Sequence, residues 1–144
     1  MIIRNVLAVV AGLGSGMAVN MALVLLNAYV LFPMPPGVDM QDPAAFQAYV
    51  SGHPAAAFLV VHAAHLGQSF AGAWVAARLG SSRPMVLAMI VGVVTLAGGV
   101  MNMTTIKGPD WMFVELPLYL VVAWGAGRRE VGRRAGPSGP AAGG

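Results

Sequence analysis

Four long apolar segments dominate this sequence and restrict its fold more than any other feature. They are separated by more polar stretches of unequal length and cover residues 6–32, 55–77, 84–106 and 111–127. The hydrocarbon core of a bilayer is about 30 Å thick, so a helix needs roughly 20 mostly apolar residues to cross it. All four segments approach or exceed this length, and only the fourth carries a carboxylate, Glu115. The sequence therefore predicts an all-α integral membrane protein, a bundle of four transmembrane helices.

Composition agrees with a lipid environment. Of the 144 residues, 58% are hydrophobic and 9% are charged, whereas roughly 25% are charged in an ordinary soluble domain. The chain has no cysteine, which excludes disulfides and thiolate metal sites. The net charge of +3 comes from scattered basic residues rather than from one basic face. We therefore expect the lipid bilayer as a partner, and no nucleic acid.

The basic residues predict the orientation of the four spans. If the chain crosses the membrane four times, Lys107 lies on one side with Asp39, Asp42 and Asp110. The arginines then share the other side: Arg4, Arg78, Arg83, Arg128, Arg129, Arg133 and Arg134. The positive-inside rule places both termini in the cytoplasm. We expect the membrane to be the bacterial inner (cytoplasmic) membrane. The first segment is longer than the apolar core of a secretory signal, so we expect it to stay uncleaved. Residues 128–144 are expected to form a tail that is first basic and then disordered.

The first outer loop is long enough to hold a helix of its own. Asp42 is a good N-cap, Pro43 suits the first helical position and Gly52 can end the helix. Phe46 and Tyr49 then share one face. We expect a short amphipathic helix near Pro43–Ser51, lying on the outer membrane surface as a clip or as a lid.

Small and polar residues recur three or four positions apart in the spans, which places them on one helix face. Within the outer half of the bundle, this inward face brings together a polar cluster: His62, His65, Glu115, Asn27, Asn102 and Asn20. Ionisable groups inside a membrane are costly and usually face the bundle interior with a partner. We expect Glu115 to pair with a histidine of another span. His62 is favoured over His65 because it lies closer to Glu115 in depth.

Three hypotheses explain the polar cluster. In the first, its members bond one another and fix the helix packing. In the second, His62, His65 and Glu115 hold a metal ion or haem, since two histidines and a carboxylate form a known ligand set. In the third, the same residues carry protons or a solute. The chain has neither a GxSxG nor an HExxH motif, so we expect no enzyme and no cofactor.

Three stretches carry a resemblance to known proteins. "VLFPMPPGVDM", "FLVVHAAHLGQSFAGAWVAARLG" and "MNMTTIKGPDWMFVELPLYLVVAW" together resemble a group of small four-span bacterial inner-membrane proteins. The resemblance covers nearly the whole chain before the tail, and it implies the topology but no activity. From the residues we predict a non-catalytic accessory or assembly subunit, which self-associates or binds a larger membrane protein. The alternative is a small transporter or a metal- or haem-binding membrane protein that uses the polar cluster.

Overall fold

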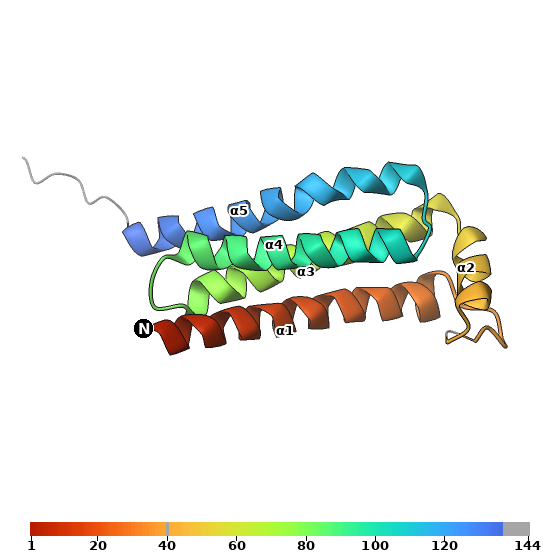
Figure 1. The fold of residues 1–144 in the computed structure, drawn as a ribbon, viewed down its shortest axis with the longest axis horizontal. Coiled ribbons are helices and arrows are strands. Elements are labelled where there is room, and N and C mark those ends of the chain that lie inside the picture. Colours follow the sequence, from red (N-terminus) through yellow and green to blue (C-terminus); the bar gives the residue numbers. More distant parts are fainter. Residues whose placement is uncertain (40, 137–144) are drawn as a thin grey trace, which may run out of the picture.

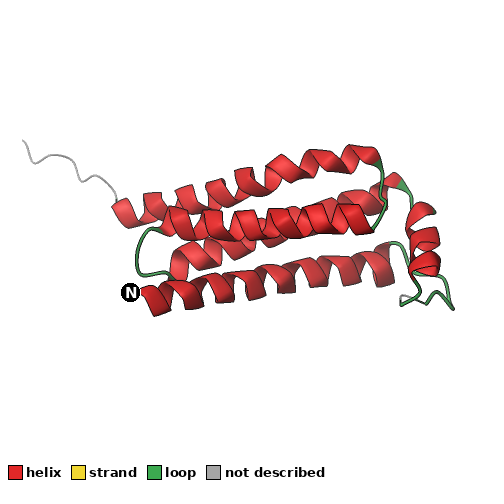
Figure 2. Ribbon diagram, viewed as in Figure 1, coloured by secondary structure: helices red, strands yellow, loops and turns green. Residues whose placement is uncertain are grey.

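The computed structural model describes residues 1–39 and 41–136, and in this part of the chain only helices, turns and loops occur (Figure 2). The prediction of an all-α fold is confirmed. The elements are α1 (Ile2–Leu26), the π-helical turn η1 (Asn27–Leu31), α2 (Pro43–Ser51), α3 (Ala55–Leu79), α4 (Pro84–Thr105), the 3-10 turn η2 (Asp110–Val114) and α5 (Glu115–Ala135).

The long helices α1, α3, α4 and α5 lie side by side and alternate in direction, and α2 crosses one end of them (Figure 1). Helix α3 is the centre of the packing, since it contacts α1, α4 and α5. Helix α1 packs mainly on α3 and touches α4 much less. The first residues of the chain and the end of α5 lie at the same end of the molecule (Figure 1).

Within the described residues, two helices are long and apolar enough to cross a membrane, Ile2–Leu31 and Pro84–Thr105. A third span results if α2 and α3, which meet at 112°, count together as one bent helix. Helix α5 continues to Ala135, so the basic residues from Arg128 to Arg134 are its last turns. The tail expected beyond them lies at 137–144, outside the described residues.

The small-residue faces predicted from the sequence bring α1 and α3 into close contact. A Cβ atom added to Gly12 would lie 2.5 Å from the carbonyl oxygen of Gly72, and one added to Gly16 would lie 2.5 Å from that of Gln68. A larger side chain at either of these glycines would therefore force the two helices apart. Gln68, which the sequence pattern leaves outside the inward face, lies in this contact because the central helix α3 has several packing faces.

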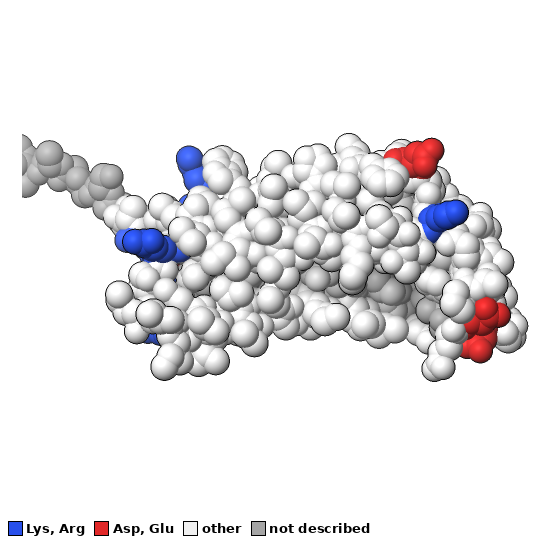
Figure 3. Space-filling model, viewed as in Figure 1, with Lys and Arg blue, Asp and Glu red and all other residues white. Residues whose placement is uncertain are grey.

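Charged side chains gather at the two ends of the bundle, and the middle of the face drawn in Figure 3 is free of them. At the arginine-rich end, Glu130 is buried and accepts hydrogen bonds from Arg133 and Arg134. Arg78 lies 3.6 Å from the same carboxylate. Arg134 also donates to the carbonyl oxygen of Ala77 in α3. This arginine clamp fastens the end of α5 to the end of α3.

The opposite end is formed by α2, whose range agrees with the prediction. The Asp42 side chain accepts a hydrogen bond of 2.9 Å from the Ala44 N–H, and Pro43 opens the helix. The Gln47 side chain then fastens α2 to the loop after α4. Its amide nitrogen donates to the Lys107 carbonyl at 2.9 Å, and its amide oxygen accepts from the Lys107 N–H at 3.0 Å.

Candidate functional site

A buried carboxylate lies near the α2 end of the bundle. Glu115 is the first residue of α5 and its side chain is fully buried. His65 Nδ1 lies 2.9 Å from Oε1 in a hydrogen bond, and His62 Nδ1 lies 2.9 Å from Oε2. The Tyr119 hydroxyl donates to Oε1 at 3.3 Å. The prediction that Glu115 pairs with a histidine of another helix is confirmed.

The preference for His62 over His65 is wrong. The hydrogen bond to Glu115 comes from His65, whereas His62 Nδ1 and Oε2 are close but not aligned, and neither has another partner. Both Nδ1 atoms lie 2.9 Å from an oxygen of Glu115, so the two histidines differ in the alignment of their rings with the carboxylate and not in depth.

A second set of hydrogen bonds ties three helices together next to the carboxylate. The Thr95 hydroxyl of α4 donates to the Ser69 hydroxyl of α3 at 3.0 Å, and Ser69 donates to the Tyr119 carbonyl of α5 at 3.0 Å. Tyr119 thus joins this set to Glu115. Sequence reasoning missed Tyr119, although its spacing of four residues from Glu115 places both on one side of a helix.

The three asparagines of the predicted cluster lie apart from Glu115, on the wall of a cavity. This cavity has a volume of about 470 Å³ and lies between the ends of α1, α3 and α4, beneath α2. Asn20 reaches it from α1, Asn27 from η1, Asn102 from α4 and His65 from α3. His62 packs instead near the ring of Trp111, with 6.3 Å between the centroids. The predicted cluster is therefore two neighbouring groups, which share His65.

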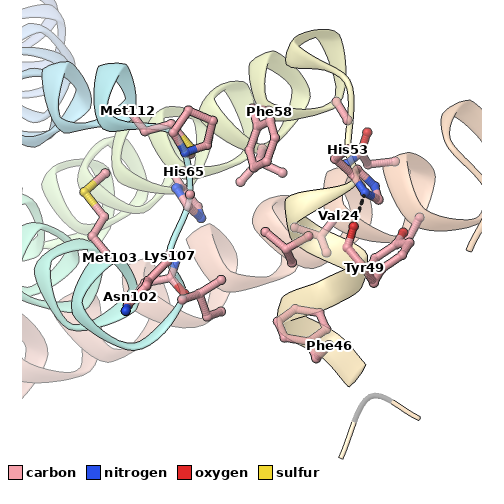
Figure 4. Close-up of a pocket in the computed structure, with 18 of the residues that line it drawn as sticks. Val24, Phe46, Tyr49, His53, Phe58, His65, Asn102, Met103, Lys107 and Met112 are labelled. Carbon is pink, nitrogen blue, oxygen red and sulfur yellow. Dashed lines mark hydrogen bonds between the residues drawn. The ribbon is translucent and has the colours of Figure 1, made fainter. Parts of the chain in front are cut away.

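Most of the cavity wall is apolar. Figure 4 shows the rings of Phe46, Tyr49 and Phe58 on one side and the side chains of Met103 and Met112 on the other. Helix α2 forms the roof, since it contributes Phe46 and Tyr49. On the face shown in Figure 3, the surface is hollowed between α4 and α1 near α2, where these two helices are poorly packed. The cavity therefore opens sideways between α1 and α4.

Asn27 is the most buried of the three asparagines. Its exposed fraction is 5%, and its side-chain oxygen is buried without a hydrogen-bond partner. It begins the π-helical turn η1, in which the Phe32 N–H donates to the Asn27 carbonyl at 2.8 Å. Such turns insert one extra residue into a helix and are frequent at functional sites.

The arrangement gives no support to a metal or haem site at His62, His65 and Glu115. Among the residues that the structure describes, no group of three His, Asp or Glu side chains is placed to hold a metal ion. The Nδ1 atom of each histidine instead faces a different oxygen of Glu115 at 2.9 Å. What the site presents is a buried, hydrogen-bonded carboxylate beside an apolar cavity with a few polar groups.

Comparison of the chain with protein-family models, with curated proteins and with solved structures finds no match. The resemblance to small four-span inner-membrane proteins stays a prediction, and the function has to be argued from the site.

Proposed function

We propose that this chain is a four-span protein of the bacterial inner membrane, with no catalytic activity, that binds a lipid-soluble small molecule in the cavity beneath α2. It acts as an accessory protein, which holds this molecule for a partner. The partner is either a second copy of the chain or a larger membrane protein.

Helix lengths and outer surfaces support four spans. The 22 residues of α4 extend about 33 Å. The five residues of η2 and residues 115–127 of α5 together extend about 30 Å, the thickness of a bilayer core. Large apolar side chains are exposed on several of these helices: Val6, Val10 and Met17 on α1, Ile90 and Val93 on α4, Val121 and Trp124 on α5. Lipid is the solvent that suits such a surface.

The distribution of charge supports the orientation. The arginine-rich end holds both the first residues of the chain and the end of α5 (Figure 1), and basic residues favour the cytoplasmic side. A reporter enzyme that works only in the cytoplasm should therefore be active when it is fused to the C-terminus. Activity of a periplasm-dependent reporter at this position would contradict the orientation.

The cavity is the observation on which the binding function depends. Its volume of about 470 Å³ falls within the roughly 300–1,000 Å³ of small-molecule sites. Such sites combine an apolar wall with a few polar groups, as this one does. Glu115, the buried carboxylate beside the cavity, is hydrogen-bonded to His65 and Tyr119, lies next to His62 and is not part of the wall. This favours a binding function over a catalytic one.

The packing of the opposite half of the bundle favours binding over transport. There α3, α4 and α5 meet in a core of fully buried small residues and one valine: Ala73, Ala76, Ala77, Ala88, Val91, Ala123 and Ala126. A transporter needs a path past this layer, and close-packed alanines leave room for none without moving whole helices.

The binding function is tested by purifying the protein in mild detergent and identifying bound lipid-soluble compounds by mass spectrometry. Val24 lines the cavity, so Val24→Phe should fill part of it and remove the bound compound. Val93 is exposed on the outer face of α4, so Val93→Phe is the matched control and should retain it. If wild type and Val24→Phe carry the same compounds in the same amounts, the proposed function is wrong.

A further inference from the structure

Helix α2 is the least firmly attached helix of the fold. None of its nine residues is buried, and it lies across the end of the long helices instead of packing along one of them (Figure 1). Among the described residues, its only hydrogen bonds to a distant part of the chain join Gln47 to Lys107. Elements with little buried surface and few long-range bonds open most easily. Of the helices described, α2 is therefore the one best able to move alone.

The Gln47 side chain acts as a latch for α2. Its amide donates to the carbonyl oxygen of Lys107 and accepts from the N–H of the same residue, so one side chain makes two bonds at one place. Both bonds are exposed to solvent, where water competes for the same groups and leaves each bond a modest net strength. The latch therefore holds α2 closed but can be released reversibly.

The connection between α2 and α3 has the form of a hinge. The two helices meet at 112° and are joined by residues 52–54, which belong to neither. The carbonyl oxygen of Tyr49 accepts a hydrogen bond of 3.0 Å from His53 Nδ1, and the centroids of the two rings lie 4.3 Å apart (Figure 4). The ring of Phe58, on α3, lies farther from His53, at 6.2 Å. Because hinge motion is absorbed by a few residues at the ends of elements, we expect His53 to move with α2 and the rotation to occur next to Pro54.

This hinged helix closes the outer end of the cavity. Phe46 and Tyr49 line the cavity from α2, while Val24 and Met103 line it from α1 and α4 (Figure 4). In the proposed orientation the opening between α1 and α4 faces lipid, whereas α2 faces the outer aqueous side. A bound molecule therefore has two ways out of the cavity, one into the bilayer and one past α2. Movement of α2 opens the second.

We infer that α2 is a hinged lid over the binding cavity. It turns about residues 52–54 and is held closed by Gln47 on the backbone of Lys107. On opening, it connects the cavity to the outer aqueous side, where the bound molecule passes to the partner. This inference rests on the proposed function and adds to it the device that controls release from the site.

The test measures how fast a charged thiol reagent reaches the cavity. The chain has no cysteine, so Val24→Cys introduces a single thiol on the cavity wall. The full chain in lipid nanodiscs is treated with sulfonatoethyl methanethiosulfonate, whose charge keeps it out of the bilayer and therefore out of the side opening. With α2 latched, modification should be slow. Adding Gln47→Leu should accelerate it by about tenfold or more, the combined effect of losing two hydrogen bonds of ordinary net strength.

Ser51→Ala is the matched control for the latch. The Ser51 hydroxyl accepts a hydrogen bond from the same Gln47 amide but makes no bond to Lys107, so modification should stay as slow as in Val24→Cys alone. Ala44→Cys, at an exposed position of α2, gives the reaction rate of an uncovered thiol.

Two results would overturn the inference. The first is that Val24→Cys with the latch intact reacts as fast as Ala44→Cys, and the second is that Gln47→Leu leaves the rate of Val24→Cys unchanged. The assay contains no ligand, so either result leaves the proposed function standing. That function fails separately, if wild type and Val24→Phe carry the same compounds in the same amounts.

Discussion

Two buried glutamates, Glu130 and Glu115, lie near opposite ends of α5 and have very different partners. Glu130 meets guanidinium groups, which are charged at all ordinary pH values, and both of its oxygens accept hydrogen bonds. Glu115 meets two imidazoles and a phenol, and its Oε2 accepts no aligned hydrogen bond. The first arrangement is a permanent clamp between helices. The second places a carboxylate beside a cavity, with partners that can gain or lose a proton.

Removing the charge should therefore affect the two sites very differently. Glu130→Gln leaves three arginines around a group that no longer balances them. Glu130 is buried but the arginines are partly exposed, so we expect a loss of about 2 kcal/mol, less than for a pair in which both partners are buried. Glu115→Gln keeps a group that can still bond to imidazole and should cost less than about 1 kcal/mol. The measurement is the free energy of unfolding of both variants in the same detergent. Equal losses would contradict the distinction between clamp and site.

The arginine clamp should also show in the dependence of stability on pH. Hydrogen bonding from Arg133 is the main cause that lowers the pKa of Glu130 from 4.5 to about 2, helped by Arg134 and Arg78. Because the pKa of the folded state is the lower one, the contribution of Glu130 is complete above pH 4.5 and disappears as the pH falls to about 2. The difference in unfolding free energy between wild type and Glu130→Gln should shrink over this range. A difference that stays constant would exclude the clamp as a source of stability.

Local sequence signals predicted much of this architecture. The N-cap Asp42, the following Pro43 and the terminal Gly52 fix the range of α2, since each acts through the backbone of its own helix. The close contacts at Gly12 and Gly16 follow from the spacing of small residues. Such signals depend only on neighbours along the chain, so they can be read without knowing the rest of the fold.

The division of the polar cluster could not be predicted in the same way. It depends on α3 lying at the centre and on the loose packing of α1 against α4, which leaves the asparagines around a cavity instead of against Glu115. The choice of His65 over His62 depends on how each ring is aligned with the carboxylate, since both Nδ1 atoms lie 2.9 Å from it. Both are properties of the packed helices, and periodicity along a single helix does not contain them.

The next test removes the acceptor from the Glu115 site altogether. Glu115→Leu leaves the Tyr119 hydroxyl and the His65 Nδ1 atom without their hydrogen-bond partner and removes the carboxylate next to His62, so we expect a loss of about 2 kcal/mol in the free energy of unfolding. Leu120→Val, a partly buried apolar change elsewhere on α5, controls for the loss of volume. If Glu115→Leu is as stable as wild type, the carboxylate is not a structural partner of the histidines.

The smallest expected effect has the opposite sign and concerns Asn27. Its buried, unpartnered oxygen is a cost to the empty protein, so Asn27→Leu, which has nearly the same shape, should raise the free energy of unfolding by about 1 kcal/mol. The same measurement on Asn5→Leu is the control. Asn5 accepts from the Ser81 N–H at 2.8 Å and donates to the Ser82 hydroxyl at 3.0 Å, so its replacement should destabilise the protein. A gain at Asn27 together with a loss at Asn5 would show that Asn27 is kept at the expense of stability, as binding groups often are. A loss at both positions would mean that Asn27 serves the packing of η1.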